Sequence, residues 1–87
     1  MLEKDFVVEN EVGLHARPAA KFTKVANSYK SDVFVIKDGK IGNGKSLLSI
    51  LALGIYKGCK FKVQVVGPDE AEALCGITKL INSNFEE

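Results

Sequence analysis

The chain has 87 residues, of which 46% are hydrophobic and 26% charged, and its net charge is +1. This length suits one domain with one core, and the near-neutral charge argues against bulk nucleic-acid binding, which requires a basic excess. The longest apolar run, residues 47–56, is interrupted by Ser49 and is too short to span a bilayer. We therefore expect a single globular domain over residues 1–87.

The cysteines and the N-terminal residues bear on the cellular compartment. Cys59 and Cys75 are the only cysteines. They lie too far apart for a C-x-x-C pair and cannot complete a zinc site with a single histidine. No window has the pattern of a secretory signal. These observations predict a cytoplasmic protein whose thiols are reduced and buried.

The first predicted elements are a strand and a helix. Residues 4–9, KDFVVE, favour β structure. Gly13 interrupts the pattern, and a helix follows from about Ala16. Pro18 is compatible only with the first turn of that helix, so the helix must begin almost at His15. The apolar residues that recur at helical spacing are Ala19, Phe22, Ala26 and Tyr29.

The middle of the chain predicts a β-hairpin and then a short helix. Residues 33–36 form a β-rich run, and the Asp-Gly pair at 38–39 is a strong turn signal before a second strand near residues 40–42. Ser46 can cap the short helix and Gly54 can end it. The apolar residues of this helix are Leu47, Leu48, Ile50, Leu51 and Leu53.

The last third predicts a strand and a final helix. Residues 60–66 alternate between apolar and polar side chains, as a half-buried strand does. Asp69 and Glu72 have the spacing of a capping box. The residues expected to face inward from the helix and its end are Leu74, Ile77, Leu80 or Ile81, and Phe85. The order β-α-β-β-α-β-α predicts an α+β fold whose antiparallel sheet is covered by helices on one face.

His15, the only histidine, is predicted to stand at a helix N-terminus. Unpaired backbone N–H groups and the positive end of the helix dipole attract anions there, so the N–H groups of Ala16 and Arg17 are candidates to hold phosphate. The Arg17 guanidinium adds a cationic fork. An imidazole nitrogen is a competent nucleophile near neutral pH, which makes His15 a candidate phosphoryl acceptor. The alternative is that His15 only begins the helix and Arg17 is a solvated side chain.

Residues 39–46, GKIGNGKS, match the nucleotide-binding pattern G-x-x-x-x-G-K-S. Three observations argue against a nucleotide hydrolase. The Asp-Gly pair at 38–39 suits a hairpin turn, only one further strand follows, and Asp69 is better explained as a helix cap than as a magnesium ligand. We therefore expect no nucleotide site in this segment.

The segment GLHARPA, residues 13–19, resembles the active-site signature of HPr, the histidine-containing phosphocarrier family of the bacterial phosphoenolpyruvate-dependent sugar phosphotransferase system. GKSLLSILALG at 44–54 and GPDEAEAL at 67–74 extend the resemblance over the chain. It implies an open-faced β-sandwich with a four-stranded antiparallel sheet and three helices. It also implies that enzyme I phosphorylates His15 and that the group passes to sugar-specific enzyme IIA domains, with Arg17 assisting. Such a protein is a carrier rather than an enzyme, needs no metal or nucleotide of its own, and is expected to be a monomer.

The resemblance also implies a role for Ser46, which corresponds to the residue that HPr kinase/phosphorylase modifies in some bacterial lineages. A phosphate there adds about −1.5 to −2 charges and would repel an acidic partner, and a catabolite-control transcription regulator is the implied reader of this form. The apolar docking patch beside His15 is predicted to consist of Leu47, Leu48 and Leu51. Two departures from the family pattern stand out: residues 46–54 lack a methionine common where serine phosphorylation regulates transcription, and Val12 replaces a small polar residue.

Two other interpretations of Ser46 remain open from the sequence. Ser46 can be a helix cap and nothing more. Alternatively, the protein is a regulatory binding module that acts through Ser46 phosphorylation and never passes a phosphoryl group on. The presence of His15 argues against the second interpretation, because a paralogous relative with only a regulatory role lacks this histidine.

Overall fold

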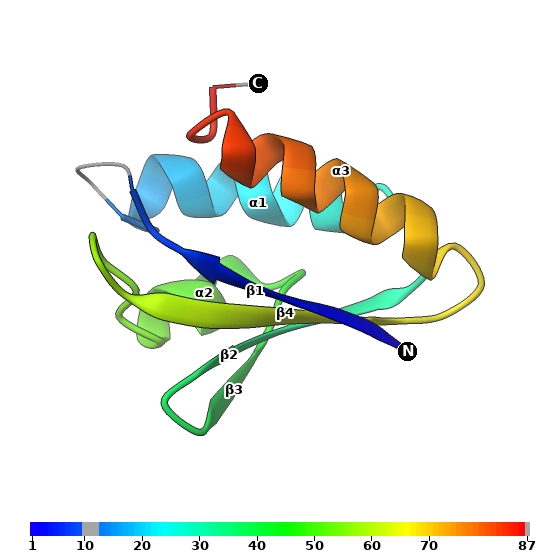
Figure 1. Cartoon of the computed structure of the whole chain (residues 1–87), viewed down its shortest axis with the longest axis horizontal. Coiled ribbons are helices and arrows are strands. Elements are labelled where there is room, and N and C mark those ends of the chain that lie inside the picture. Colours follow the sequence, from blue (N-terminus) through cyan, green and yellow to red (C-terminus); the bar gives the residue numbers. More distant parts are fainter. Residues whose placement is uncertain (10–12, 87) are drawn as a thin grey trace.

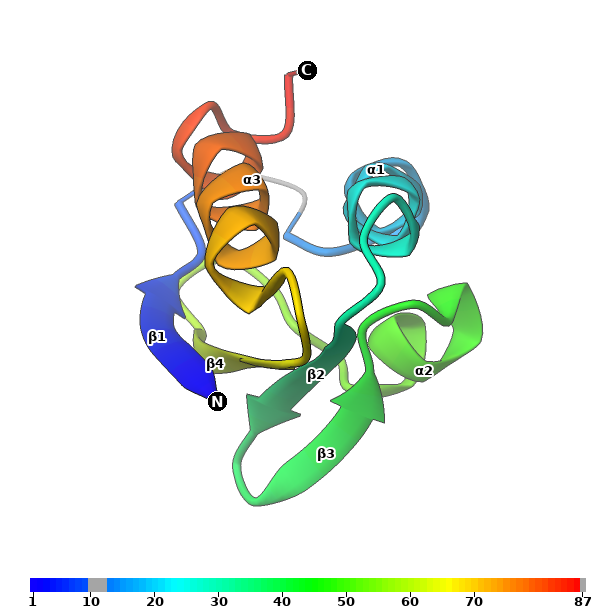
Figure 2. The ribbon, with the colours of Figure 1, turned by 90° about the vertical axis from the view of Figure 1, so that its right-hand side faces the viewer.

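The computed structural model describes residues 1–9 and 13–86. Its strands are β1 (Leu2–Val7), β2 (Asp32–Lys37), β3 (Lys40–Asn43) and β4 (Lys60–Val66), and its helices are α1 (Ala16–Asn27), α2 (Leu47–Ala52) and α3 (Glu70–Asn82) (Figure 1). The strands form one antiparallel sheet in the order β1-β4-β2-β3. Figure 2 shows α1 and α3 side by side over one face of this sheet, with α2 beside β3. The predicted fold class and order of elements are confirmed.

The core lies between the sheet and the helices. Val63 of β4 pairs with Val35 of β2, and Phe61 of β4 pairs with Phe6 of β1. The two phenyl rings stack with their centroids 5.6 Å apart. The helices contribute Ala19, Phe22 and Ala26 from α1, Ile50 from α2, and Ala73, Ile77, Leu80 and Ile81 from α3. The helical periodicity in the sequence therefore identified the buried faces, apart from Tyr29 and Leu74, which are only partly buried.

The β2–β3 connection is a two-residue turn with positive φ at both Asp38 (50°) and Gly39 (79°). Such a pair of angles is typical of hairpin turns whose twist matches that of the strands. Residues 40–43 then form a strand, and the N–H of Gly44 donates to the carbonyl of Val33 at 2.7 Å. The GKIGNGKS segment is therefore the returning arm of a hairpin rather than a loop around phosphates.

The first strand lies two residues earlier than predicted. β1 covers residues 2–7 instead of 4–9, because its pairing with β4 runs from Leu2 opposite Val65 to Val7 opposite Lys60. Register is set by the partner strand and by which face is buried, neither of which is contained in local β propensity.

The prediction of two buried thiols is wrong for Cys75 and only partly met by Cys59. Cys59 is partly buried, whereas Cys75 is exposed. Cys75 lies on α3, whose buried face is formed by Ile77, Leu80 and their neighbours, so its side chain falls on the solvent side.

Within residues 1–9 and 13–86, none of the helices has the length and the apolar character that a membrane-spanning helix requires.

Asp69 is the N-cap residue of α3, but its side chain does not cap the helix. Its carboxylate accepts hydrogen bonds from the backbone N–H groups of Lys30 and Ser31, at 2.9 Å each, and from the Ser31 hydroxyl. The carboxylate of Glu70 instead accepts from the N–H of Gly67 at 3.1 Å. The predicted capping box is therefore wrong, and Asp69 ties the start of α3 to the turn between α1 and β2.

These hydrogen bonds predict a specific acid sensitivity. The Ser31 hydroxyl first, and the Lys30 N–H second, lower the pKa of Asp69 to about 2. The carboxylate should stabilise the fold at neutral pH and lose this effect as the pH falls from about 4 to 2, because the unfolded chain binds the proton more readily in that range. We expect Asp69→Asn to be less stable than the parent at pH 7, with a difference that shrinks towards pH 2. Urea unfolding of both proteins over this range measures the difference, and a constant difference would contradict the expectation.

Candidate functional site

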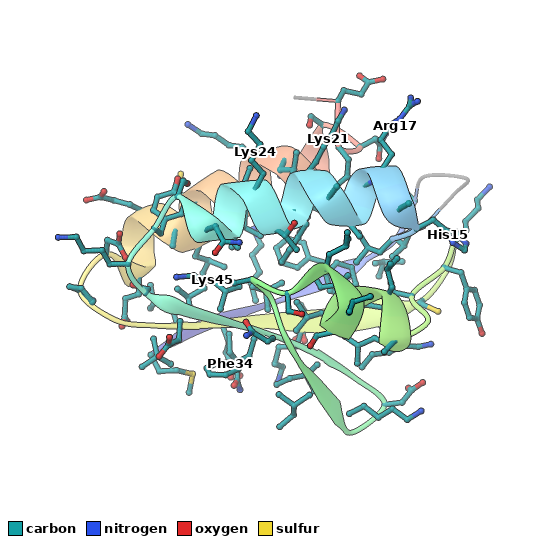
Figure 3. All side chains as sticks on the ribbon, turned by 180° about the vertical axis from the view of Figure 1, so that it is seen from behind. His15, Arg17, Lys21, Lys24, Phe34 and Lys45 are labelled. Carbon is teal, nitrogen blue, oxygen red and sulfur yellow. The ribbon has the colours of Figure 1, made fainter. Side chains whose placement is uncertain are left out.

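His15 is the N-cap residue of α1, with extended backbone angles (φ −80°, ψ −166°). Its carbonyl accepts the first helical hydrogen bond from the N–H of Ala19 at 2.8 Å. Its imidazole makes no capping hydrogen bond and is exposed (Figure 3). The ring therefore stands at the start of the helix without serving to cap it, and the prediction that the helix begins almost at His15 is confirmed.

The start of α1 is electrostatically suited to an anion. Ala16 and Arg17 occupy its first two positions, where backbone N–H groups have no partner inside a helix. Pro18 follows in the same turn, where the lack of an N–H costs nothing, and it is buried. The first turn carries no acidic residue that would offset the positive end of the helix dipole. A phosphoryl group on the His15 ring would lie at this positive end.

Arg17 is exposed and leaves α1 in a different direction from His15, as Figure 3 shows. Both residues nevertheless line one shallow hollow, which also includes Ala16, Pro18, Lys21, Asn84, Phe85 and Glu86. The structure thus places the two predicted groups at one hollow, with their charged or polar ends pointing apart. Val12, where the sequence departs from the family pattern, lies outside the described residues.

No pattern in the sequence marks the residues after α3 as neighbours of His15. Phe85 is buried, its N–H donates to the Leu80 carbonyl at 2.9 Å, and its own carbonyl accepts from Lys21 Nζ at 2.7 Å. Asn84 and Phe85 both have positive φ, which turns the chain back onto α1. The proximity of Lys21 to Arg17 could have been predicted from the sequence, because Lys21 lies one turn later on the same helix. The contact between α1 and the turn after α3 could not.

The exposed side of α1 is positively charged along its length. Arg17, Lys21 and Lys24 extend from the same side of the helix in Figure 3, and residues 16–27 contain no acidic side chain. Because the net charge of the chain is only +1, this arrangement reflects segregation of charge rather than a basic protein. Such a surface complements an acidic partner.

Ser46 is the N-cap residue of α2, and its Oγ accepts a hydrogen bond from the N–H of Ser49 at 3.3 Å, which confirms the predicted cap. The start of α2 lies beside the last turn of α1, because the side-chain amide of Asn27 donates to the Lys45 carbonyl at 3.1 Å. His15 begins the same helix, so Ser46 and His15 lie towards opposite ends of α1, as the labels of Lys45 and His15 in Figure 3 indicate.

The predicted docking leucines differ in exposure. Leu47 and Leu48 are exposed, and Leu48 has 79% of its surface accessible, whereas Leu51 is partly buried against the core. Tyr56, in the loop after α2, adds an exposed aromatic ring that the sequence pattern did not mark. This loop is hydrogen bonded to the segment that leads into α1. Exposed apolar groups therefore follow α2 from the Ser46 end towards the His15 end.

Comparison with known proteins shows which family this chain resembles in sequence and in fold. The family described as "PTS HPr component phosphorylation site" matches residues 2–83. The phosphocarrier protein HPr of Neisseria meningitidis serogroup A is 41% identical over 87 residues, which cover 100% of this chain and 98% of the relative. The HPr-like protein Crh of Halalkalibacterium halodurans is 42% identical over 74 residues, which cover 85% of this chain and 88% of the relative. The crystal structure of HPr from Thermoanaerobacter tengcongensis has a TM-score of 0.96 and 41% identity, covering 100% of this chain and 98% of that structure.

The open-faced sandwich and the matching family define a phosphoryl-carrier protein, a class that holds a phosphoryl group without catalysing a reaction of its own. The chain belongs to the HPr family, the phosphocarriers of the phosphotransferase system.

Proposed function

We propose that His15 accepts a phosphoryl group from phosphorylated enzyme I and donates it to sugar-specific enzyme IIA domains. The observation that carries this proposal is the exposed imidazole at the N-cap of α1, which takes no part in capping. Such exposure lets two different partners approach the ring in turn. Membership of the HPr family supports the choice of partners.

The proposed transfer needs positioning and charge stabilisation more than covalent chemistry from the protein. A ring nitrogen of His15 attacks the phosphorus atom, a P–N bond forms, and the bond between phosphorus and the donor breaks. In the onward step the acceptor on enzyme IIA attacks the same phosphorus atom and the P–N bond breaks. The backbone N–H groups of Ala16 and Arg17 hold the phosphate oxygens. Rotation of the Arg17 side chain towards the ring adds a cationic fork.

Docking is proposed to use the charged side of α1 together with the exposed leucines of α2. The cations steer an acidic partner surface, and Leu47 and Leu48 supply apolar contact area near it. A modest interface of this kind suits a carrier, which must release each partner quickly. The proposed compartment is the cytoplasm, and the unpaired thiols of Cys59 and Cys75 fit a reducing environment.

Leu48 provides a test of the docking surface. We expect Leu48→Ala to raise the KM for phosphorylation by enzyme I about threefold to tenfold, because an exposed apolar contact is lost from the interface. The free energy of unfolding should change by less than about 0.5 kcal/mol, since the side chain is exposed. Ile41→Ala is the matched control: Ile41 is 68% exposed, and because a Cβ on the next residue, Gly42, would meet Leu53 and Ser49, the Ile41 side chain points to the opposite face of the sheet from α2. Equal values of KM for the two variants would contradict the proposed docking surface.

We further propose that Ser46 is phosphorylated by HPr kinase/phosphorylase and that a catabolite-control regulator binds this form. A phosphate on Oγ would stand beside Leu47 and Leu48 and oppose the approach of an acidic partner. Its oxygens would still accept the hydrogen bond from the Ser49 N–H that the hydroxyl accepts now. The modification should therefore alter docking without unfolding α2.

The experiment that tests the carrier function is incubation with phosphoenolpyruvate and enzyme I, followed by mass spectrometry. We expect the mass gain of one phosphoryl group, its loss in acid, and its transfer when an enzyme IIA is added. No gain, or a gain that no enzyme IIA removes, would contradict the proposal. An ATP-dependent, acid-stable phosphate on Ser46 without turnover at His15 would support a regulatory module instead.

A further inference from the structure

We propose that Lys37 is a positioning residue for His15 and that it acts through the loop between α2 and β4, residues 53–59. This inference rests on the proposed role of His15 as the phosphoryl acceptor. Lys37 ends strand β2 and is not among the residues that line the hollow beside His15. Its effect is carried by two successive contacts.

The first contact joins the loop to the segment that leads into α1. Leu14 is only 2% exposed, and its N–H donates to the Ile55 carbonyl at 2.9 Å. Gly13 lies so close to the loop that an added Cβ would be 2.5 Å from Tyr56 Cα and 2.7 Å from the Ile55 carbonyl oxygen. The position of the backbone immediately before His15 is therefore fixed by its contact with the backbone of residues 55 and 56.

The second contact joins the same loop to Lys37. Lys37 Nζ donates to the Gly54 carbonyl at 2.7 Å and to the Leu53 carbonyl at 3.4 Å. The same nitrogen lies 4.8 Å from the centre of the Tyr56 ring, a cation–π distance. One ammonium group thus holds the residues on both sides of Ile55.

The position of Lys37 in the sheet explains how it reaches the loop. Residues two apart on a strand share a face, so Lys37 follows the buried Val33 and Val35 onto the side that the helices cover. The last turn of α2 contains no basic residue. Lys37 supplies, from the sheet, the cation that interacts favourably with carbonyl groups at the end of a helix.

Removal of the ammonium group should loosen the path to His15. The carbonyl groups of Leu53 and Gly54 lose their donor and the Tyr56 ring loses its cation, so Ile55 is held less firmly. Leu14 and the start of α1 then gain freedom, and the imidazole spends less time in the orientation that in-line transfer requires. Loss of preorganised geometry lowers kcat more than it raises KM, because Lys37 lies outside the proposed docking residues.

The test compares Lys37→Met with Lys40→Met. The first keeps the aliphatic stem and removes the ammonium group, and the second removes the same charge from the residue paired with Lys37 across the hairpin. In Lys37→Met we expect amide hydrogen exchange at Leu14 to accelerate about tenfold and kcat for phosphorylation by enzyme I to fall about tenfold. Lys40→Met should stay near the parent in both. Lys37→Arg should recover most of both values, because it retains the donors and the cation.

Each remaining outcome overturns the proposal. Unchanged Leu14 exchange in Lys37→Met would show that the contact does not hold the segment. An equal fall of kcat in both methionine variants would show that the loss of one positive charge, rather than the loss of the contacts with the loop, causes the effect. Faster exchange with an unchanged kcat would leave Lys37 without a positioning role. The exchange measurement requires no phosphoryl transfer, so a failure of the parent protein to accept phosphate at His15 would refute the proposed function separately.

Discussion

His15→Ala is expected to abolish acceptance of a phosphoryl group from enzyme I. The substitution removes the only imidazole of the chain. Arg17, a charged neighbour in the hollow, cannot replace it as nucleophile, because a guanidinium group offers donors only and has no free lone pair for attack. Mass spectrometry after incubation with phosphoenolpyruvate and enzyme I should detect no acid-labile phosphoryl group on the variant. An acid-labile gain that survives the substitution would show that another residue carries the group.

A second substitution at this position separates loss of chemistry from loss of fold. The imidazole is exposed and does not cap α1, so His15→Ala should change the free energy of unfolding by no more than about 0.5 kcal/mol. His15→Asn places a capping side chain at the same N-cap position; it can accept only from the Arg17 N–H, because Pro18 has none, and should add about 0.5 kcal/mol of stability. We expect this variant to be equally inactive and slightly more stable. Denaturant unfolding and the phosphorylation assay on the same sample measure both quantities.

Gly13→Ala is expected to destabilise the fold and to displace His15. Gly13 has a φ of 62°, a region that costs a residue with a Cβ about 1–2 kcal/mol. The added Cβ would also meet the backbone of Ile55 and Tyr56, which cannot yield as a flexible side chain can. We expect the free energy of unfolding to fall by about 2–4 kcal/mol. The phosphorylation rate should fall roughly 100-fold if His15 moves by about 1 Å.

Gly39→Ala is the matched control for this substitution. Gly39 also has positive φ (79°), but a Cβ added there meets nothing within 4 Å. The free energy of unfolding of this variant should fall only by the conformational cost of positive φ, about 1–2 kcal/mol, and its phosphorylation rate should equal that of the parent. Thermal or urea unfolding with the enzyme I assay compares the two. If the Gly39 variant lost as much stability and activity as the Gly13 variant, close packing against the loop would not be the cause.

Several parts of the fold and site were predictable because their signals lie within a few residues. Proline is tolerated only in the first turn of a helix, so the helix that contains Pro18 has to begin at most a few residues before it. This one residue was enough to predict that His15 lies at the helix start. The Asp-Gly pair at 38–39 is suited to positive φ at two successive residues, and it makes the predicted hairpin turn. Ser46 needed only the N–H of Ser49, three residues on, to act as the predicted cap.

Other features depend on residues that are distant in sequence. Aspartate is a residue type that favours helix N-caps, but in the folded protein Lys30 and Ser31 offer the Asp69 carboxylate three donors. The turn at Phe85 joins the hollow beside His15 because Lys21 holds its carbonyl, 64 residues away along the chain. No local pattern contains either partnership.

The sequence by itself determined the order of the elements, the buried faces of its helices, and the location of its single histidine at a helix start, since each depends on spacing within a few residues. Only the tertiary structure decided which strands are neighbours, which donors the Asp69 carboxylate finds, and how Lys37 and the 53–59 loop support the segment before His15. The physical reason is that these contacts are made between groups far apart in the chain. Their partners are set by the packing of the whole core rather than by the propensities of neighbouring residues.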